Sequence, residues 1–79
     1  MTSEHEKKLA EVFRVVLELN EAADVTAVRR LTTPKWDSLA HISFIAAIES
    51  EFNIALGIAD MDRMTSFTAT RLLLEEKGL

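Results

Sequence analysis

The sequence predicts an all-α protein, an irregular four-helix bundle with three longer helices and one short helix. Apolar residues recur at helical spacing in three segments, as they do on helices that bury one face. Only 2 Gly and 1 Pro occur among the 79 residues, so few helix breaks are available. Hydrophobic residues make up 48% of the chain and charged residues 28%, which favours one globular domain over residues 1–79.

Composition also narrows the possible functions. A formal net charge of −4 disfavours binding to nucleic acid, which requires positive charge to neutralise phosphates. The chain has no cysteine, so disulfides and thiolate metal sites are not available, and we expect no metal site. The acidic, polar start lacks the order of a signal peptide, and no apolar run approaches membrane-spanning length. We therefore expect a cytoplasmic monomer without membrane insertion.

The first helix is expected to begin near Ser3 and to fade near Asn20. Ser3 and Glu6 have the spacing of a capping box, in which each side chain accepts a hydrogen bond from the other residue's backbone N–H. Charged residues fall mostly outside the apolar stripe, which indicates a structural helix with one buried face. The stripe consists of Leu9, Val12, Phe13, Val16 and Leu19.

Residues 21–36 are the least regular stretch and must connect the first helix to the second. A short helical turn is expected between Ala22 and Leu31, where Val25, Val28 and Leu31 supply apolar anchors at a spacing of three. Pro34 then interrupts the helical pattern, because the residue before proline avoids helical backbone angles. A connection of this length in a small domain usually packs through its own side chains or carries function.

The second helix is expected over roughly residues 37–52, with Asp37 as its N-cap. Apolar side chains surround much of its circumference, so it should contact more than one neighbour and keep apolar surface for a partner. Asn53 is suited to end it in a left-handed conformation. Residues 13, 44, 52 and 67 are all phenylalanine, and we expect each of them in the core.

The rest of the chain is expected to hold a loop, one short helical turn around residues 60–64, and a final helix. Ser66 or Thr65 can cap the final helix with a side-chain oxygen. Gly78 follows the last apolar residues of that helix and can end it, because glycine adopts left-handed angles without steric cost. Connections of unequal length favour an irregular bundle.

The residues Asp37-Ser38-Leu39 place a serine hydroxyl in the first turn of the apolar second helix. The helix dipole and the free N–H groups at that end favour a phosphate ester. This three-residue motif, followed by an apolar helix that ends in the sequence ESEFNI over residues 49–54, is similar to the modification site of acyl carrier proteins. The order of elements resembles that family over nearly the whole chain.

The resemblance implies a function for several residues. Ser38 would carry phosphopantetheine through a phosphodiester installed by a phosphopantetheinyl transferase, and acyl groups would be carried as thioesters on the arm. Asp37 would cap the helix and help to position the transferase and its metal. Leu39 and Ile42 would form the apolar part of a docking surface. The chain would then not be an enzyme, and its other partners would be acyl-loading and acyl-transferring enzymes such as a ligase, a ketosynthase or an acyltransferase.

Trp36 and the methionines are open to two interpretations. Trp36 is either an exposed anchor for partners, since tryptophan is common in interface hot spots, or a residue that packs its loop onto the second helix. Met61, together with Ile54 and Met64, either lines the mouth of a groove beside the arm or fills the core. We include Trp36 and Met61 among the candidate partner-binding residues.

The chain also departs from the family pattern. Carriers of fatty acid synthesis usually have acidic residues along the second helix where this chain has Ala40, Ser43 and Ser50. This difference favours a specialised pathway, such as polyketide, modified-peptide or surface-lipid biosynthesis. An aminoacyl or peptidyl carrier is an alternative, although such carriers often have glycine before the motif, where this chain has Lys35-Trp36. A helical adaptor that keeps the bundle without the arm is a second alternative.

Ser38, Asp37 and His41 also contain the residue types of a hydrolase triad. Asp37 adjoins the serine, however, and does not stand behind the imidazole as the triad mechanism requires. The Gly-x-Ser-x-Gly turn of α/β-hydrolases is absent as well. His41 is instead expected on the surface, one turn from Ser38, where its protonated ring would touch the phosphate of the arm.

Overall fold

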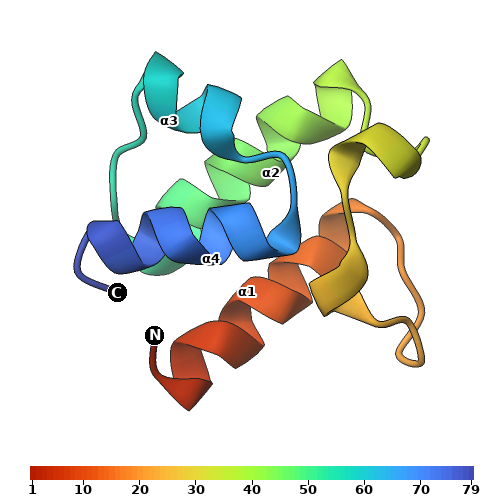
Figure 1. The fold of residues 1–79 in the computed structure, drawn as a ribbon, viewed down its shortest axis with the longest axis horizontal. Helices are drawn as coiled ribbons and strands as arrows, with labels where there is room; N and C mark the ends of the chain where they lie inside the picture. Colours follow the sequence, from red (N-terminus) through yellow and green to blue (C-terminus); the bar gives the residue numbers. More distant parts are fainter.

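Four helices and two short 3-10 turns make up the protein in the computed structural model, which describes residues 1–79 (Figure 1). The helices are α1 (Ser3–Val16), α2 (Ser38–Phe52), α3 (Ile58–Arg63) and α4 (Phe67–Glu76). The 3-10 turns are η1 (Val25–Ala27) and η2 (Arg30–Thr32). The structure has no strands, so the prediction of an all-α bundle with three longer helices and one short helix is confirmed.

Helix α1 differs from the prediction at both ends. Its N-cap is Thr2, whose side-chain oxygen accepts the His5 N–H at 3.1 Å, so the capping box predicted at Ser3 is wrong. The helix ends at Val16 and does not continue toward Asn20. Glu18 adopts a left-handed conformation with φ of 54°, which lets the Leu19 N–H bond back to the Arg14 carbonyl at 2.9 Å and closes the helix.

The connection between α1 and α2 is attached to the start of α4. The Arg30 N–H donates to the Thr65 carbonyl at 2.8 Å, and the Phe67 N–H donates to the Val28 carbonyl at 3.1 Å. The predicted turn is present as η1 and η2, and Val25 is buried as expected. Leu31 is 97% exposed, so its predicted role as an apolar anchor is wrong. The apolar spacing of three continues to Leu31, but η2 buries none of its residues.

The core is built around an aromatic cluster, which we define as Phe13, Trp36, Phe44 and Phe67. Phe13 lies at its centre, with edge-to-face ring contacts at centroid distances of 4.6 Å to Phe44, 5.2 Å to Phe67 and 5.4 Å to Trp36. Such contacts add to the stabilisation that comes from burial. The cluster joins α1, α2, α4 and the segment before α2. Phe52 is also buried, so all four phenylalanines are core residues as predicted.

Helices α3 and α4 complete the bundle. Helix α3 spans Ile58–Arg63 and so begins two residues before the predicted turn at 60–64. The Asp60 carboxylate accepts the Gly57 N–H at 3.0 Å, which fixes this earlier start. Ser66 caps α4 by accepting the Ala69 N–H at 3.0 Å, as predicted. None of the four helices combines the length and the apolar character that crossing a membrane would require.

The two ends of the chain lie close together (Figure 1). The N-terminal ammonium of Met1 donates to the Glu75 carboxylate at 2.7 Å. Asn53 ends α2 in the left-handed conformation, with φ of 53°, as predicted. Gly78 follows α4 with φ of 97°, a conformation that glycine adopts readily.

Candidate functional site

Ser38 is the first residue of α2 and is exposed. Asp37 precedes it in an extended conformation and caps the helix, because its Oδ1 accepts the Ala40 N–H at 2.8 Å. The Asp37 carbonyl accepts the His41 N–H at 2.9 Å and so begins the helical hydrogen-bond pattern. The first N–H groups of a helix have no carbonyl partner within it, so this end of α2 is positively polarised. The hydroxyl of Ser38 stands at that end.

The segment before Ser38 forms a turn that is anchored to the core by a buried side chain. The Trp36 N–H donates to the Thr33 carbonyl at 2.9 Å, which closes a turn around Pro34. The indole of Trp36 then enters the aromatic cluster, at 5.4 Å from Phe13 and 5.3 Å from Phe44 between ring centroids. Burial of this ring fixes the residues that follow it, so Ser38 is presented on an anchored segment and not on a free loop.

Trp36 is therefore not the exposed partner-binding anchor that was one of its two interpretations. Its side chain is 2% exposed, and the aromatic cluster surrounds it. The other interpretation, that Trp36 packs its loop onto α2, is confirmed. The sequence could not decide between them because a tryptophan before a helix cap is compatible with either position.

The expectation that His41 lies free on the surface is also wrong. The ring is half-buried, and its Nδ1 accepts a hydrogen bond from the Trp36 indole Nε1–H at 3.0 Å. Its Nε2 lies 3.1 Å from the carbonyl oxygen of Met61 in α3. Both ring nitrogens thus have hydrogen-bond partners other than Ser38. No local pattern could have revealed this, because Met61 lies 20 residues away along the chain.

An exposed apolar surface lies next to Ser38 on α2. Leu39 is 74% exposed and Ile42 is 65% exposed, and a spacing of three residues places them on the same side of the helix. Ile58, at the start of α3, is 81% exposed. Large apolar side chains that remain in water are common at interaction sites when they cluster. The surface predicted at Leu39 and Ile42 is thus available to a partner.

The groove predicted beside the arm is not present. Met64 is fully buried, and Ile54 and Met61 are half-buried and pack against the core. None of the three surface hollows is lined by any of these residues or by Ser38. For Met64 the alternative interpretation as a core residue is confirmed. Met61 contributes its backbone carbonyl, which accepts from His41, and this was not predicted.

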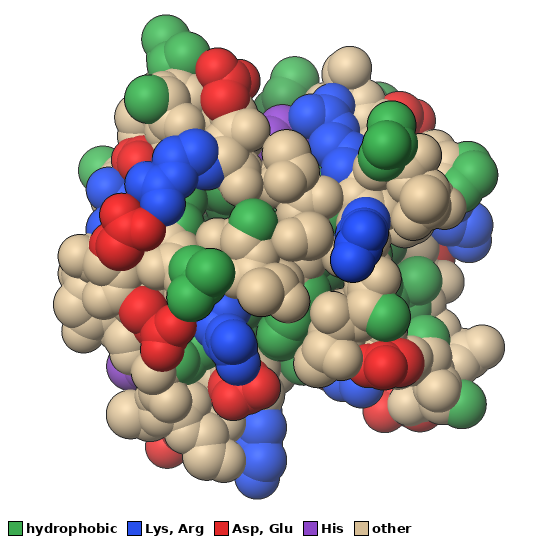
Figure 2. Space-filling view, in the orientation of Figure 1, with side chains coloured by type: hydrophobic (Ala, Val, Ile, Leu, Met, Phe, Trp, Pro, Cys, Tyr) green, Lys and Arg blue, Asp and Glu red, His purple; other side chains and the backbone are tan.

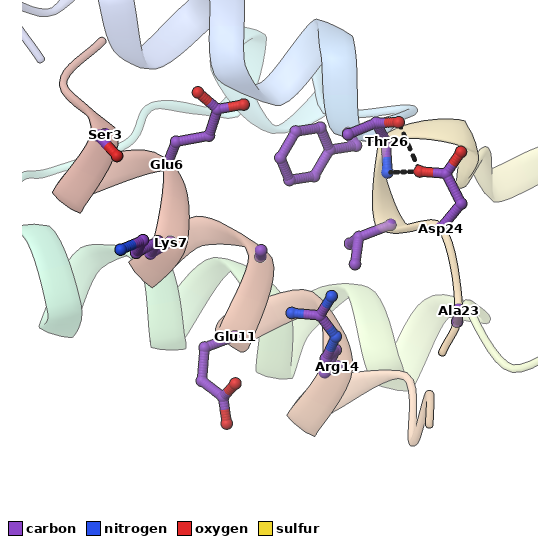
Figure 3. A pocket seen from close by; sticks show the side chains of 11 residues that line it. Ser3, Glu6, Lys7, Glu11, Arg14, Ala23, Asp24 and Thr26 are labelled. Carbon is purple, nitrogen blue, oxygen red and sulfur yellow. Dashed lines mark hydrogen bonds between the residues drawn. The ribbon is translucent and has the colours of Figure 1, made fainter. Parts of the chain in front are cut away.

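The three hollows lie elsewhere on the molecule. One of about 490 Å³ lies between α1 and η1, where acidic and basic side chains alternate along its wall (Figure 3). The Asp24 carboxylate in that wall accepts both the N–H and the hydroxyl of Thr26, and so caps η1 (Figure 3). A second hollow of about 1060 Å³ lies between η2 and α4, and a third of about 560 Å³ lies between α1 and α2. No three His, Asp or Glu side chains are grouped so that they could hold a metal ion.

Charged pairs gather at the end of the bundle formed by α3 and α4. Arg63 binds the Glu76 carboxylate through two guanidinium nitrogens. The Lys77 Nζ lies 2.9 Å from the Asp60 Oδ2. The hydrogen bond from Arg63 lowers the pKa of Glu76. The pKa of Asp60 is lowered mainly by the hydrogen bond from the Gly57 N–H, and further by the hydrogen bond from Lys77. On the face seen in Figure 2, Lys and Arg side chains alternate with Asp and Glu and form no continuous basic patch.

No protein-family model matches the chain, and comparisons with curated proteins and with solved structures gave no significant match.

Proposed function

We propose that this protein is an acyl carrier protein and that Ser38 carries phosphopantetheine. One observation supports this most strongly. An exposed serine hydroxyl stands at the first position of a helix of 15 residues, directly after an aspartate that caps the helix. The N–H groups of the first turn can stabilise the negative charge of a phosphodiester at that position.

Modification would proceed by transfer from coenzyme A. The oxygen of Ser38 forms a bond to the β-phosphorus of coenzyme A, the bond between its two phosphates breaks, and adenosine 3′,5′-bisphosphate leaves. A separate transferase takes up the proton of the hydroxyl, because His41 is engaged with Trp36 and Met61. The thiol at the end of the arm then carries an acyl group as a thioester. Tethering raises the effective concentration of that group at each partner site.

The chemistry of the surface beside Ser38 suits partners that make apolar contacts. Leu39 and Ile42 are exposed there, and the neighbouring exposed positions Ser43 and Ala46 carry no charge. The two acidic residues of α2, Glu49 and Glu51, lie near its opposite end. We therefore propose a specialised pathway, in which a transferase and acyl-handling enzymes such as a ligase, a ketosynthase or an acyltransferase contact this apolar surface.

The test uses coenzyme A, a broad-specificity phosphopantetheinyl transferase and intact-mass measurement. Wild type should gain the mass of one phosphopantetheine, and Ser38→Ala should gain nothing. Ser50→Ala is the matched control, since it removes an exposed serine hydroxyl near the opposite end of the same helix, and it should be modified like wild type. Absence of modification on wild type would contradict the carrier function and favour an adaptor that has kept the fold alone.

Loading assays on the modified protein would define the cargo. Loading by acyl-transferring enzymes of a specialised pathway would support the proposal. Loading by the fatty acid synthesis enzymes alone would contradict the proposed pathway, and selective loading with amino acids would indicate an aminoacyl or peptidyl carrier.

A further inference from the structure

We infer that His41 is a positioning residue, which ties the segment carrying Ser38 to helix α3 and so sets how a partner enzyme meets the serine. The hydrogen bonds of His41 are present in the structure, while their consequence for the loading of Ser38 rests on the proposed function. We call the three residues Trp36, His41 and Met61 the histidine clip.

The protonation of the ring follows from the chemistry of its neighbours. An indole nitrogen can only donate a hydrogen bond, so the His41 Nδ1 that lies 3.0 Å from the Trp36 Nε1 must be an acceptor without a hydrogen. The other ring nitrogen, Nε2, then carries the hydrogen of the neutral imidazole and donates it to the Met61 carbonyl at 3.1 Å. Both partners are satisfied by this tautomer and by no other form of the ring.

The clip and the first backbone hydrogen bond of α2 hold the two residues that precede Ser38. Trp36 binds the imidazole of His41, and the carbonyl of Asp37 accepts the backbone N–H of His41 at 2.9 Å. The imidazole also lies against aromatic rings, with centroid distances of 6.0 Å to Trp36 and 6.3 Å to Phe44. Ser38 follows directly after these two residues, and we expect the His41 side chain to influence its orientation through the hydrogen bond to Trp36.

The same ring reaches across to α3. Met61 belongs to α3, which is otherwise joined to α4 by the ion pairs of Arg63 and Asp60. The clip therefore connects the start of α2, where Leu39 and Ile42 are exposed, to the helix that exposes Ile58. An enzyme that contacts both helices while it reaches Ser38 requires a fixed relation between them.

Kinetics of the transferase test the positioning role. His41→Phe keeps an aromatic ring but removes both hydrogen bonds, and we expect kcat/KM for loading of Ser38 to fall roughly fivefold. His41→Asn places an amide oxygen near the position of Nδ1 and should recover part of the loss. Measurements at a temperature where circular dichroism shows every variant fully folded exclude a loss that reflects unfolding. Ser50→Ala, an exposed change on the same helix, is the matched control and should leave kcat/KM unchanged.

A double-mutant cycle tests whether Trp36 and His41 act together. Trp36→Phe removes the donor, and the combination with His41→Phe should lower kcat/KM by less than the product of the two single effects. Wild-type kcat/KM in fully folded His41→Phe, or independent effects in the cycle, would overturn the positioning role.

Nitrogen-15 NMR of the imidazole tests the clip without any enzyme. At pH 7.5 the spectrum should show a protonated Nε2 and an unprotonated Nδ1, and Trp36→Phe should shift the Nδ1 resonance. A protonated Nδ1 would overturn the clip. If wild type is not loaded by the transferase at all, the proposed function and the loading role of His41 both fail, whereas the NMR result still decides whether the clip exists.

Discussion

The two ends of the bundle are stabilised by different means. At the end that carries Ser38, a buried indole, a half-buried imidazole and a backbone carbonyl form neutral hydrogen bonds beneath the surface. At the end formed by α3 and α4, an exposed ion pair joins Arg63 to Glu76, and a half-buried ion pair joins Lys77 to Asp60. Exposed pairs contribute little because water and salt screen them. The segment that presents the serine is thus held by buried rings and neutral hydrogen bonds, whereas ion pairs join α3 to the end of α4.

The largest effect should follow the loss of the ring beneath Ser38. Trp36→Ala removes a buried side chain from the aromatic cluster and should lower the free energy of unfolding by about 3–5 kcal/mol. Unfolding in guanidinium chloride, followed by circular dichroism, measures this change. Trp36→Phe retains most of the ring and should cost clearly less. Equal stability of Trp36→Ala and wild type would mean that this end of the bundle is not anchored as described.

The second-largest loss of stability should follow removal of the two hydrogen bonds of the His41 ring. His41→Phe leaves the indole N–H of Trp36 without an acceptor and the Met61 carbonyl without its donor. Leaving a buried donor without a partner costs on the order of 1–3 kcal/mol, so we expect a loss in that range. The midpoint of chemical unfolding gives the value. A variant as stable as wild type would contradict the difference drawn between the two ends.

A smaller effect is expected from the helix cap. Asp37→Ala removes the acceptor of the Ala40 N–H and should lower the free energy of unfolding by about 1 kcal/mol. Asp37→Asn retains a side-chain oxygen at the cap and should remain close to wild type. A thermal unfolding series on the three proteins compares them, and a larger loss for Asp37→Asn than for Asp37→Ala would contradict the capping role.

The smallest losses of stability should follow removal of the ion pairs between α3 and the end of α4, and these losses should depend on pH. The pKa values of Asp60 and Glu76 are lowered from their ordinary values of 3.8 and 4.5. A carboxyl group whose pKa is lowered by folding stabilises the folded state above its ordinary pKa, and this contribution is lost as the pH falls through the lowered value. Glu76→Gln should therefore weaken stability slightly at pH 7, the difference from wild type should disappear as the pH falls through the lowered pKa of Glu76, and high salt should diminish the effect at pH 7.

Much of the fold could be predicted because the signals are local. Asp37, Ser66 and Asn53 lie at helix ends whose caps depend on bonds within a few residues, and all three predictions are confirmed. The cap of α1 was misassigned because Thr2 and Ser3 are adjacent and chemically equivalent as caps. Leu31 was misassigned for a different reason. Helical spacing alone does not show that the chain turns away from the core at η2.

In the candidate site, too, the features set by local sequence could be predicted, and those set by distant contacts could not. Exposure of Ser38 and its place at the start of α2 followed from the local motif, and the structure has both features. Burial of Trp36 and the clip through His41 depend on contacts with Phe13 and Met61, which are distant in sequence. Such contacts are settled only when the elements pack, so neither could be derived from spacing.

Tandem mass spectrometry of the protein after incubation with coenzyme A and a phosphopantetheinyl transferase tests the central claim most directly. The peptide that contains Ser38 should carry the modification and release a pantetheine fragment on activation, and no other peptide should do so. An unmodified Ser38 peptide, or a modification on another residue, would contradict the assignment of this serine as the attachment point.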